Sequence, residues 1–241
     1  MKVNKTSKIV LVNKIDNSPK PKSQNVISES IIKKLQNQKP NTKLFDLIYG
    51  KKFCVVGNSP KELGSGNGKI IDSYDIVIRF KNYDITDEFA KDYGAKTDIW
   101  ITPFNLTQFY RDPAQYKSVC CCLPLTHPRW QKRFPTTNIN YELMAKYNNI
   151  EFVPLKTFQQ IWDKYEKGQP SSGMTTLYWL YKLIGKLNKK DLFGFSIFDP
   201  KESHHYFSHK ESHKLSTEWA KNTPYVHPRK IEVRVFNEIT V

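Results

Sequence analysis

The stretch Phe53-Cys54-Val55-Val56-Gly57-Asn58-Ser59 changes abruptly from apolar residues to small and polar ones. Four apolar residues that end at a glycine are typical of a buried strand that enters a loop. Glycine lets a ligand approach the main chain, and Asn and Ser side chains hydrogen-bond to bases and sugars. An ordinary structural turn is the alternative, and Gly57-Asn58-Ser59 taken alone does not exclude it.

Short apolar runs recur along the chain after this first strand. They predict strands at 75–80, 97–101, 117–123, 151–154 and 191–195, and a helix at 174–187. This alternation indicates an α/β fold: a single Rossmann-like domain with a mainly parallel sheet and helices on both faces. Ligands of such sheets lie at the carboxyl ends of the strands, near a switch in strand order. The candidate loops are therefore those after Val56, Phe80 and Phe195. Alternating polar and apolar residues at 230–236 predict a further strand at an edge.

Residues 1–48 are polar and rich in lysine, and we interpret them as an N-terminal extension before a folded domain at 49–241. One short amphipathic helix, which we expect to dock on the core, is predicted there from the spacing of Ile27, Ile31, Ile32 and Leu35. The first fifty residues hold no apolar stretch long enough for a signal peptide or a membrane span. We therefore expect any membrane contact to be peripheral.

The chain is strongly basic: its 241 residues include 38 Lys and Arg against 23 Asp and Glu, a formal net charge of +15. Such a charge attracts nucleic acid, anionic lipid headgroups or acidic glycans. Many lysines lie in the first fifty residues and along helix-like stretches, where a solvated face is the more common explanation. Nucleic-acid binding is therefore a secondary hypothesis, and no nucleic-acid partner is expected.

Three of the four cysteines are consecutive, at Cys120, Cys121 and Cys122, inside a predicted buried strand. Neighbouring side chains on a strand point to opposite faces, which argues against a disulfide framework, and no cysteine spacing suggests zinc. We expect the thiols to be packing residues in a reducing compartment.

The segment Pro170-Ser171-Ser172-Gly173 stands directly before the predicted helix. Serine at a helix start caps unpaired amides, and these amides with the positive end of the helix dipole also suit a nucleotide phosphate. An ordinary helix cap is the alternative. Two other phosphate sites are excluded: the glycines at 64, 66 and 68 have the wrong spacing for a dinucleotide fingerprint, and no Lys-Ser or Lys-Thr follows them.

Histidines gather near the C-terminus, at His204, His205 and His213, with Glu218 five residues after the last of them. Histidine can take a proton near neutral pH or, when charged, stabilise a leaving phosphate. Surface or metal-binding histidines are the alternative, although no spacing here matches a zinc helix.

Together these segments resemble glycosyltransferase family 29, the animal-type sialyltransferases, in the order and spacing of their sialyl motifs. Residues 54–80 resemble the large motif and 170–195 the small motif. His205-Tyr206 is similar to the third motif, and His213 with Glu218 is similar to the very small motif, His-x4-Glu. The resemblance implies a variant GT-A-like catalytic domain over 49–241.

The family implies an inverting, metal-independent transfer of sialic acid from CMP-sialic acid to a glycan or glycolipid hydroxyl, with no cofactor. It places His213 as the general base, His205 on the departing phosphate, and CMP against Gly57, Asn58, Ser59, Ser171, Ser172, Gly173 and Gly194. A non-catalytic basic module that binds glycans or nucleic acid on a decayed transferase fold is the alternative from another class.

The chain also departs from the family. Lys81 stands where the family has Asn after the Arg-aromatic pair, which makes Asn82, one place later, the candidate donor-binding Asn, and Lys61 also replaces an Asn. Two extra cations near the donor would suit another CMP-linked acidic sugar, such as Kdo. Phe53 and Ile184 occupy the positions of the disulfide that secretory-pathway members form between the large and small motifs. We therefore expect a cytoplasmic bacterial or viral enzyme of surface polysaccharide or lipooligosaccharide synthesis, peripheral on the inner face of an anionic membrane.

The acceptor is expected to contact the loops between residues 103 and 169. Aromatic side chains there offer stacking surfaces for sugars, although most are expected in the core: Trp130, Phe134, Tyr141, Trp162 and Tyr165.

Overall fold

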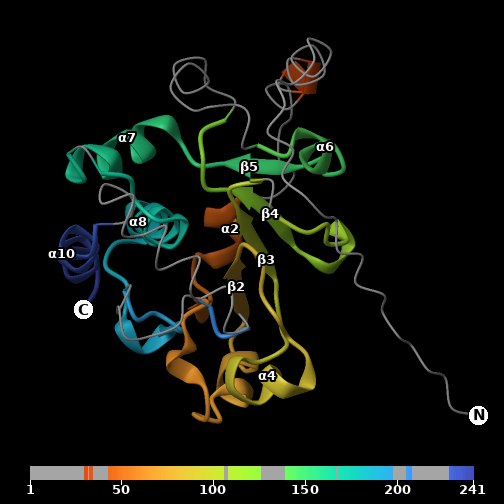
Figure 1. The fold of residues 1–241 in the computed structure, drawn as a ribbon, viewed down its shortest axis with the longest axis vertical. Coiled ribbons are helices and arrows are strands. Elements are labelled where there is room, and N and C mark those ends of the chain that lie inside the picture. The colour runs from red at the N-terminus through yellow and green to blue at the C-terminus, as the bar shows by residue number, and fades with distance from the viewer. Residues whose placement is uncertain are drawn as a thin grey trace, which may run out of the picture.

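A computed structural model describes residues 30–31, 33–34, 43–105, 108–125, 139–166, 168–197, 205–207 and 228–241. Its sheet runs in the order β5-β4-β3-β2-β1-β6, with every neighbouring pair parallel (Figure 1). The strands are β1 (Phe53–Val56), β2 (Ile76–Phe80), β3 (Ile99–Thr102), β4 (Ser118–Cys121), β5 (Ile150–Phe152) and β6 (Leu192–Phe193). The predicted α/β fold is confirmed.

Helices and short 3-10 turns connect these strands. The helices are α2 (Leu44–Ile48), α3 (Gly68–Asp72), α4 (Asp87–Tyr93), α6 (Tyr141–Met144), α7 (Leu155–Lys164), α8 (Ser172–Ile184) and α10 (Arg229–Ile239). The 3-10 turns are η1 (Pro60–Glu62), η2 (Pro113–Gln115) and η4 (Lys189–Asp191). In Figure 1, α7, α8 and α10 lie together at one side of the sheet.

The strand order places a switch beside β1. The chain builds β2, β3, β4 and β5 successively away from β1, and then returns to add β6 to the other edge of β1. The loops that follow β1 and β6 therefore lie next to each other at the carboxyl end of the sheet, where parallel α/β folds bind ligands.

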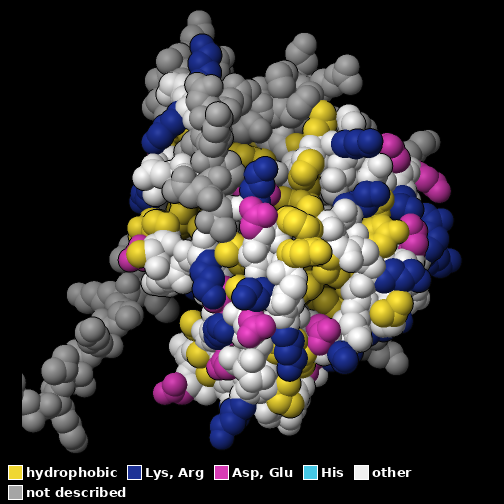
Figure 2. Space-filling view, turned by 180° about the vertical axis from the view of Figure 1, so that it is seen from behind, with side chains coloured by type: hydrophobic (Ala, Val, Ile, Leu, Met, Phe, Trp, Pro, Cys, Tyr) yellow, Lys and Arg dark blue, Asp and Glu magenta, His cyan; other side chains and the backbone are white. Residues whose placement is uncertain are grey.

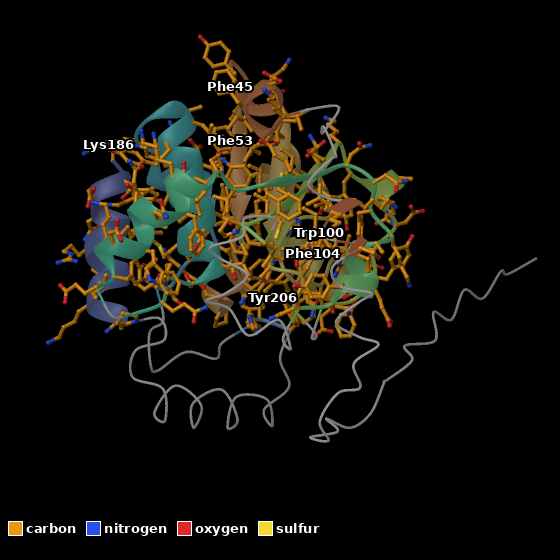
Figure 3. The ribbon with its side chains drawn as sticks, turned by 90° about the horizontal axis from the view of Figure 1, so that it is seen from above. Phe45, Phe53, Trp100, Phe104, Lys186 and Tyr206 are labelled. Carbon is orange, nitrogen blue, oxygen red and sulfur yellow. The ribbon has the colours of Figure 1, made fainter. Side chains whose placement is uncertain are left out.

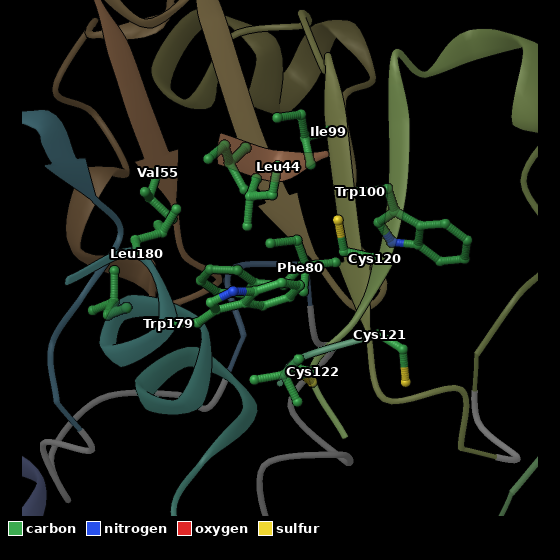
Figure 4. Close-up of a cluster of buried hydrophobic side chains, with 14 of the residues drawn as sticks. Leu44, Val55, Phe80, Ile99, Trp100, Cys120, Cys121, Cys122, Trp179 and Leu180 are labelled. Atoms are coloured by element: carbon green, nitrogen blue, oxygen red, sulfur yellow. The ribbon is translucent and has the colours of Figure 1, made fainter. Parts of the chain in front are cut away.

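Helices cover both faces of the sheet. On one face, Val55, Ile78 and Ile99 pack with Leu44 of α2 and Leu177 of α8 in the main core. Figure 4 shows Trp179 and Leu180 of α8 beside Phe80 on that face. The opposite face packs a second cluster under α3 and α4, with members Cys54, Val56, Val77, Ile71 and Tyr93.

The four cysteines are unpaired and fully buried, as predicted. The register places Cys120 on the face of Ile101, and Cys121 on the opposite face. Burial raises the pKa of Cys54 to about 12 and that of Cys122 to about 11, so these thiols remain protonated at neutral pH.

The strand predicted at 230–236 is wrong, because these residues belong to α10. The prediction followed the alternation of apolar residues, yet Val233 is 37% exposed. Four-residue spacing places Val235 and Ile239 on one helical face, and both are fully buried. Packing of α10 against α8 therefore decides the structure here.

The folded body begins before residue 49. Leu44 and Ile48 of α2 are buried in the core, and the Glu151 carboxylate accepts a hydrogen bond from the Leu44 N–H. Residues 43–48, which composition assigns to the extension, are therefore part of the packed structure. Ile31 contacts the core, while the other three apolar residues of the predicted amphipathic helix lie outside the described residues.

Within the described ranges, no helix is both long and apolar enough to cross a membrane. Figure 2 shows Lys and Arg side chains scattered over one face and interleaved with acidic ones. On that face the basic charge is spread widely, as expected of a solvated surface.

Candidate functional site

The first wall of the site joins the loop after β1 to the end of β6. The Gly57 N–H donates to the Phe193 carbonyl at 2.7 Å, and the Ser59 N–H donates to the Gly194 carbonyl at 3.0 Å. A Cβ on Gly57 would lie 2.2 Å from the Gly194 oxygen, and Gly194 has a φ of +67°. Both glycines are needed because the two backbones touch.

Asn58 connects this loop to the end of β2. Its side-chain amide donates to the Phe80 carbonyl at 3.2 Å and to the Asn82 carbonyl at 2.9 Å. Since both amide hydrogens are used, the oxygen Oδ1 is the group that Asn58 can offer to a ligand, as an acceptor. The Asn82 side chain accepts from the Phe109 N–H at 3.1 Å, which orders the loop after β3.

The segment 205–207 is held against the same loop. The Tyr206 N–H donates to the Asn58 carbonyl at 2.9 Å, and the Tyr206 ring stacks on Tyr93 at 3.9 Å between centroids. Its hydroxyl accepts from the Asp84 N–H at 2.8 Å. Figure 3 shows Tyr206 at the opposite end of the sheet from Phe53, the first residue of β1. His205, the neighbour of Tyr206, is thereby held beside the candidate site.

A buried network behind the loop was not anticipated from the sequence. The Glu62 carboxylate accepts from the Gly194 N–H at 3.0 Å and from the Asn67 amide at 2.8 Å. The Tyr93 hydroxyl donates to the Ser59 carbonyl at 2.6 Å and accepts from the Glu62 N–H at 3.2 Å. The Ser59 hydroxyl accepts from the first turn of η1. The loop is thus held by hydrogen bonds from several sides.

The glycine-rich segment at 63–68 is structural. The Gly64 and Gly66 N–H groups each donate to the Asp92 carboxylate at 2.8 Å, which holds its pKa below the usual range. A Cβ on Gly68 would lie 2.0 Å from the Ala90 oxygen. Gly68 therefore allows α3 and α4 to approach each other, while Gly64 and Gly66 take the positive φ of the loop that binds Asp92.

Another wall of the site is the N-terminus of α8. Ser171 caps the helix, since its hydroxyl accepts from the Met174 N–H at 3.1 Å. The buried Glu232 carboxylate of α10 accepts from the Ser171 N–H at 2.9 Å and from its hydroxyl at 3.1 Å. Ser171 is therefore committed to protein contacts, and it positions Ser172 and Gly173, whose N–H groups begin the helix.

Gly173 faces the carboxyl end of β2. A Cβ there would meet the Phe80 and Phe195 rings at 3.7–3.8 Å, which is ordinary contact distance. Because the Phe80 carbonyl also binds Asn58, the helix terminus lies close to the loop after β1.

Most of the predicted site residues are therefore brought together at the strand-order switch. His204, His213 and Glu218 lie outside the described residues. In the part of the chain that the structure describes, no group of three His, Cys, Asp or Glu residues could hold a metal ion. The arrangement offers main-chain N–H donors and a helix dipole for a phosphate, and an amide oxygen for a base or ribose.

One of the aromatics considered for the acceptor is a core residue, and two others are partly buried. Tyr165 is fully buried, and Trp162 and Tyr141 pack against the main core. Trp130 and Phe134 lie outside the described residues. The exposed aromatics are instead Phe109 at 62% and Tyr110 at 52%, in the loop that the Asn82 side chain orders.

Known proteins resemble this chain in sequence. The sequence model of glycosyltransferase family 29 (sialyltransferase) matches residues 2–119. Sialyltransferase-like protein 2 of Oryza sativa subsp. indica is 36% identical over 81 residues, which are 32% of this chain and 20% of that protein. CMP-N-acetylneuraminate-beta-galactosamide-alpha-2,3-sialyltransferase 2 of Mus musculus is 24% identical over 199 residues, 78% of this chain. The chain spans about half, 53%, of that mouse relative.

Solved structures show the same fold. A mammalian sialyltransferase in complex with Gal-beta-1-3GalNAc-ortho-nitrophenol has a TM-score of 0.50 and 17% identity, over 84% of each chain. A second structure of a mammalian sialyltransferase has a TM-score of 0.50 and 18% identity, over 87% of this chain and 86% of that one. The predicted fold class, including its GT-A variant, agrees with both.

Proposed function

The chain belongs to glycosyltransferase family 29, and from this we propose that it transfers sialic acid from CMP-sialic acid to a hydroxyl of a glycan. The observation that carries the proposal is the meeting of three motif segments at the strand-order switch. Tyr206 and the Phe80 carbonyl both bind Asn58, while Gly57 and Gly194 pack on each other. Segments far apart in sequence thus build one rigid pocket wall.

The donor nucleotide is held by neutral groups in this proposal. The Asn58 oxygen accepts from the cytosine amino group or a ribose hydroxyl, and the Ser172 and Gly173 N–H groups donate to the phosphate. The packed positions of these groups mean that little reorganisation is needed on binding, which favours transition-state stabilisation.

The chemistry is an inverting displacement. His213 takes the proton of the acceptor hydroxyl as its oxygen forms a bond to the anomeric carbon, and CMP leaves with the bonding electrons. His205 stabilises the departing phosphate. As in the family, no metal ion takes part. The proposed site for His213 rests on the His-x4-Glu motif in the sequence.

The proposal also covers the acceptor glycan and the cellular location of the reaction. A galactose-ended glycan suits the family, and Phe109 and Tyr110 offer exposed rings near the donor loop for the apolar face of a sugar. We place the reaction in surface polysaccharide or lipooligosaccharide synthesis, at the cytoplasmic side of an anionic membrane. The net charge of +15 supports that contact.

Release of CMP from CMP-sialic acid with a galactose-ended acceptor tests the function. His213→Ala is expected to lower the rate about 10²- to 10⁴-fold, because it removes the general base. His209→Ala, which removes a histidine of the same stretch with no proposed role, is the matched control. Activity retained in the His213 variant would remove the proposed base.

CMP-Kdo is the second donor to compare, since Lys61 and Lys81 add positive charge near the donor. A higher rate with CMP-Kdo than with CMP-sialic acid would move the assignment to Kdo transfer. Calorimetry with CMP separates both from a non-catalytic basic module, which binds anions with a steep salt dependence but has no CMP pocket.

A further inference from the structure

Lys81 has an unusual and firmly held backbone. It follows β2 directly and adopts a φ of 54°, in the left-handed region that few non-glycine residues occupy. Its N–H donates to the Ile101 carbonyl at 2.9 Å, and its carbonyl accepts from the Trp100 indole at 2.7 Å. The carbonyls just before and after it accept from Asn58. Contacts on every side therefore keep this conformation, as is common where strain serves a site.

This conformation determines which side of the sheet the lysine serves. Strand alternation would send Lys81 toward the face of Arg79, opposite Phe80. The groups that raise the Lys81 pKa are instead Cys122 and Glu232, and Glu232 binds Ser171 at the start of α8. The ring of Phe80, the residue before Lys81, also lies 3.8 Å from where a Cβ on Gly173 would stand. The left-handed turn interrupts the strand alternation, so Lys81 lies between the Asn58 loop and the N-terminus of α8.

Among the residues that the structure describes, the Lys81 ammonium has no hydrogen-bond acceptor. Burial lowers its pKa, while Cys122 and Glu232 raise it in part. Across the described ranges, no side chain or carbonyl accepts a hydrogen bond from this ammonium, and it makes no direct ion pair with Glu232. A partly buried cation beside unpaired helix N–H groups is a place for an anion.

Glu232 is fixed as the counter-charge. It is fully buried, and Ser171 donates to both carboxylate oxygens, at 2.9 and 3.1 Å. Burial raises its pKa to about 7, and the groups that lower it are Ser171, Tyr165 and Lys81. Near neutral pH this carboxyl can therefore take up a proton when another anion arrives at Lys81.

We infer that Lys81 is a specificity-determining residue that binds the phosphate of the nucleotide donor, with Glu232 as its counter-charge before the donor binds. The inference rests on the proposed function for the location of the donor. The proposed function gives the phosphate only neutral N–H donors, whereas this inference adds the positively charged Lys81 ammonium as a partner of the phosphate. Bound phosphate takes the place of Glu232 as the partner of Lys81, and Glu232 gains a proton from solvent.

Calorimetry with cytidine and with the methyl ester of CMP tests this assignment. The ester has a phosphodiester with a single charge and no sugar carboxylate, and cytidine has no phosphate. For the ester, Lys81→Met is expected to weaken binding about 10- to 100-fold, while cytidine affinity stays unchanged. Lys186→Met removes one exposed lysine beyond the far end of α8 and controls for the change in net charge.

A second readout needs no change at Lys81. Titrations of the wild-type chain with the ester near pH 7, in buffers of different ionisation enthalpy, are expected to show proton uptake. Glu232→Gln is expected to abolish that uptake, because it removes the titrating carboxyl.

Lys81→Arg keeps the charge and is expected to retain most of the ester affinity, which separates loss of charge from misfolding.

Several results would overturn the inference. Equal ester affinity in the Lys81→Met and wild-type chains, an equal loss in Lys186→Met, or a parallel loss for cytidine would each remove Lys81 from the phosphate. A loss seen only with CMP-sialic acid would assign Lys81 to the sugar carboxylate instead. If the wild-type chain bound neither cytidine nor the ester, the proposed donor site itself would be wrong.

Discussion

Replacing the buried Glu232 by glutamine should change how stability depends on pH. Glutamine keeps an oxygen for the Ser171 N–H, and its amide can donate to the Ser171 hydroxyl, so the helix cap survives. The substitution removes the ionisable carboxyl, so position 232 no longer titrates. The comparison therefore isolates the cost of ionising one buried carboxyl.

The size of the effect follows from the two pKa values of Glu232. Burial raises the folded value from 4.5 to about 7, so the folded state holds the proton more tightly than the unfolded chain. The stabilisation is complete below pH 4.5 and is lost as pH rises through 7. The difference between the two values corresponds to about 3 kcal/mol of unfolding free energy.

Urea denaturation of both chains at pH 5, 6, 7 and 8 measures it. The wild-type chain should lose stability relative to Glu232→Gln as pH rises, by about 3 kcal/mol over this range. Glu238→Gln removes an exposed carboxyl from the same helix, where it pairs with Lys164, and should change stability by less than about 1 kcal/mol. A constant difference between wild type and Glu232→Gln at every pH would refute the reasoning.

The other predictions concern the loop after β1. Gly57→Ala places a Cβ 2.2 Å from the Gly194 oxygen and should abolish CMP binding in calorimetry. Gly173→Ala, whose Cβ would have contacts at 3.7 Å or more, should keep the fold. Normal CMP binding by the Gly57 variant would contradict the close approach. Asn58→Asp turns two donated hydrogen bonds into repulsion between oxygens and should lower the unfolding free energy by about 2 kcal/mol or more; an unchanged urea midpoint would show that these bonds do not hold the loop. Tyr206→Phe loses the hydroxyl that binds Asp84 and should lower the unfolding free energy by about 1 kcal/mol, because the ring still stacks on Tyr93. If Tyr206→Phe lost as much stability in thermal unfolding as Tyr206→Ala, the ring stacking would contribute nothing, which would contradict this prediction.

The strands of the sheet were predictable because their signal is local. Cys54, Val55 and Val56 are all buried, as an apolar run before a glycine suggests. The error at 230–236 has a physical cause: alternation at Ile231, Val233 and Val235 also fits a helix in which the middle residue faces solvent. Tertiary packing against α8 chose between the two patterns.

The site was predictable only in part. Gly57, Asn58 and Ser59 stand out as a strand-to-loop change, and the structure explains why the glycine is required. Glu62 and Tyr93 support that loop from the side, and their roles depend on contacts across 31 positions or more of sequence. No local pattern marks such residues. The left-handed turn at Lys81 likewise depends on hydrogen bonds with Trp100 and Ile101 of the neighbouring strand β3.

The most direct measurement of the central claim is a map of backbone amide chemical shifts in the wild-type chain as CMP is added. The account predicts saturable changes concentrated at Asn58, Ser59, Ser172 and Gly173, where the carboxyl ends of β1 and β6 meet α8. Changes confined to other surfaces, or no saturable change at all, would contradict a CMP site at the strand-order switch.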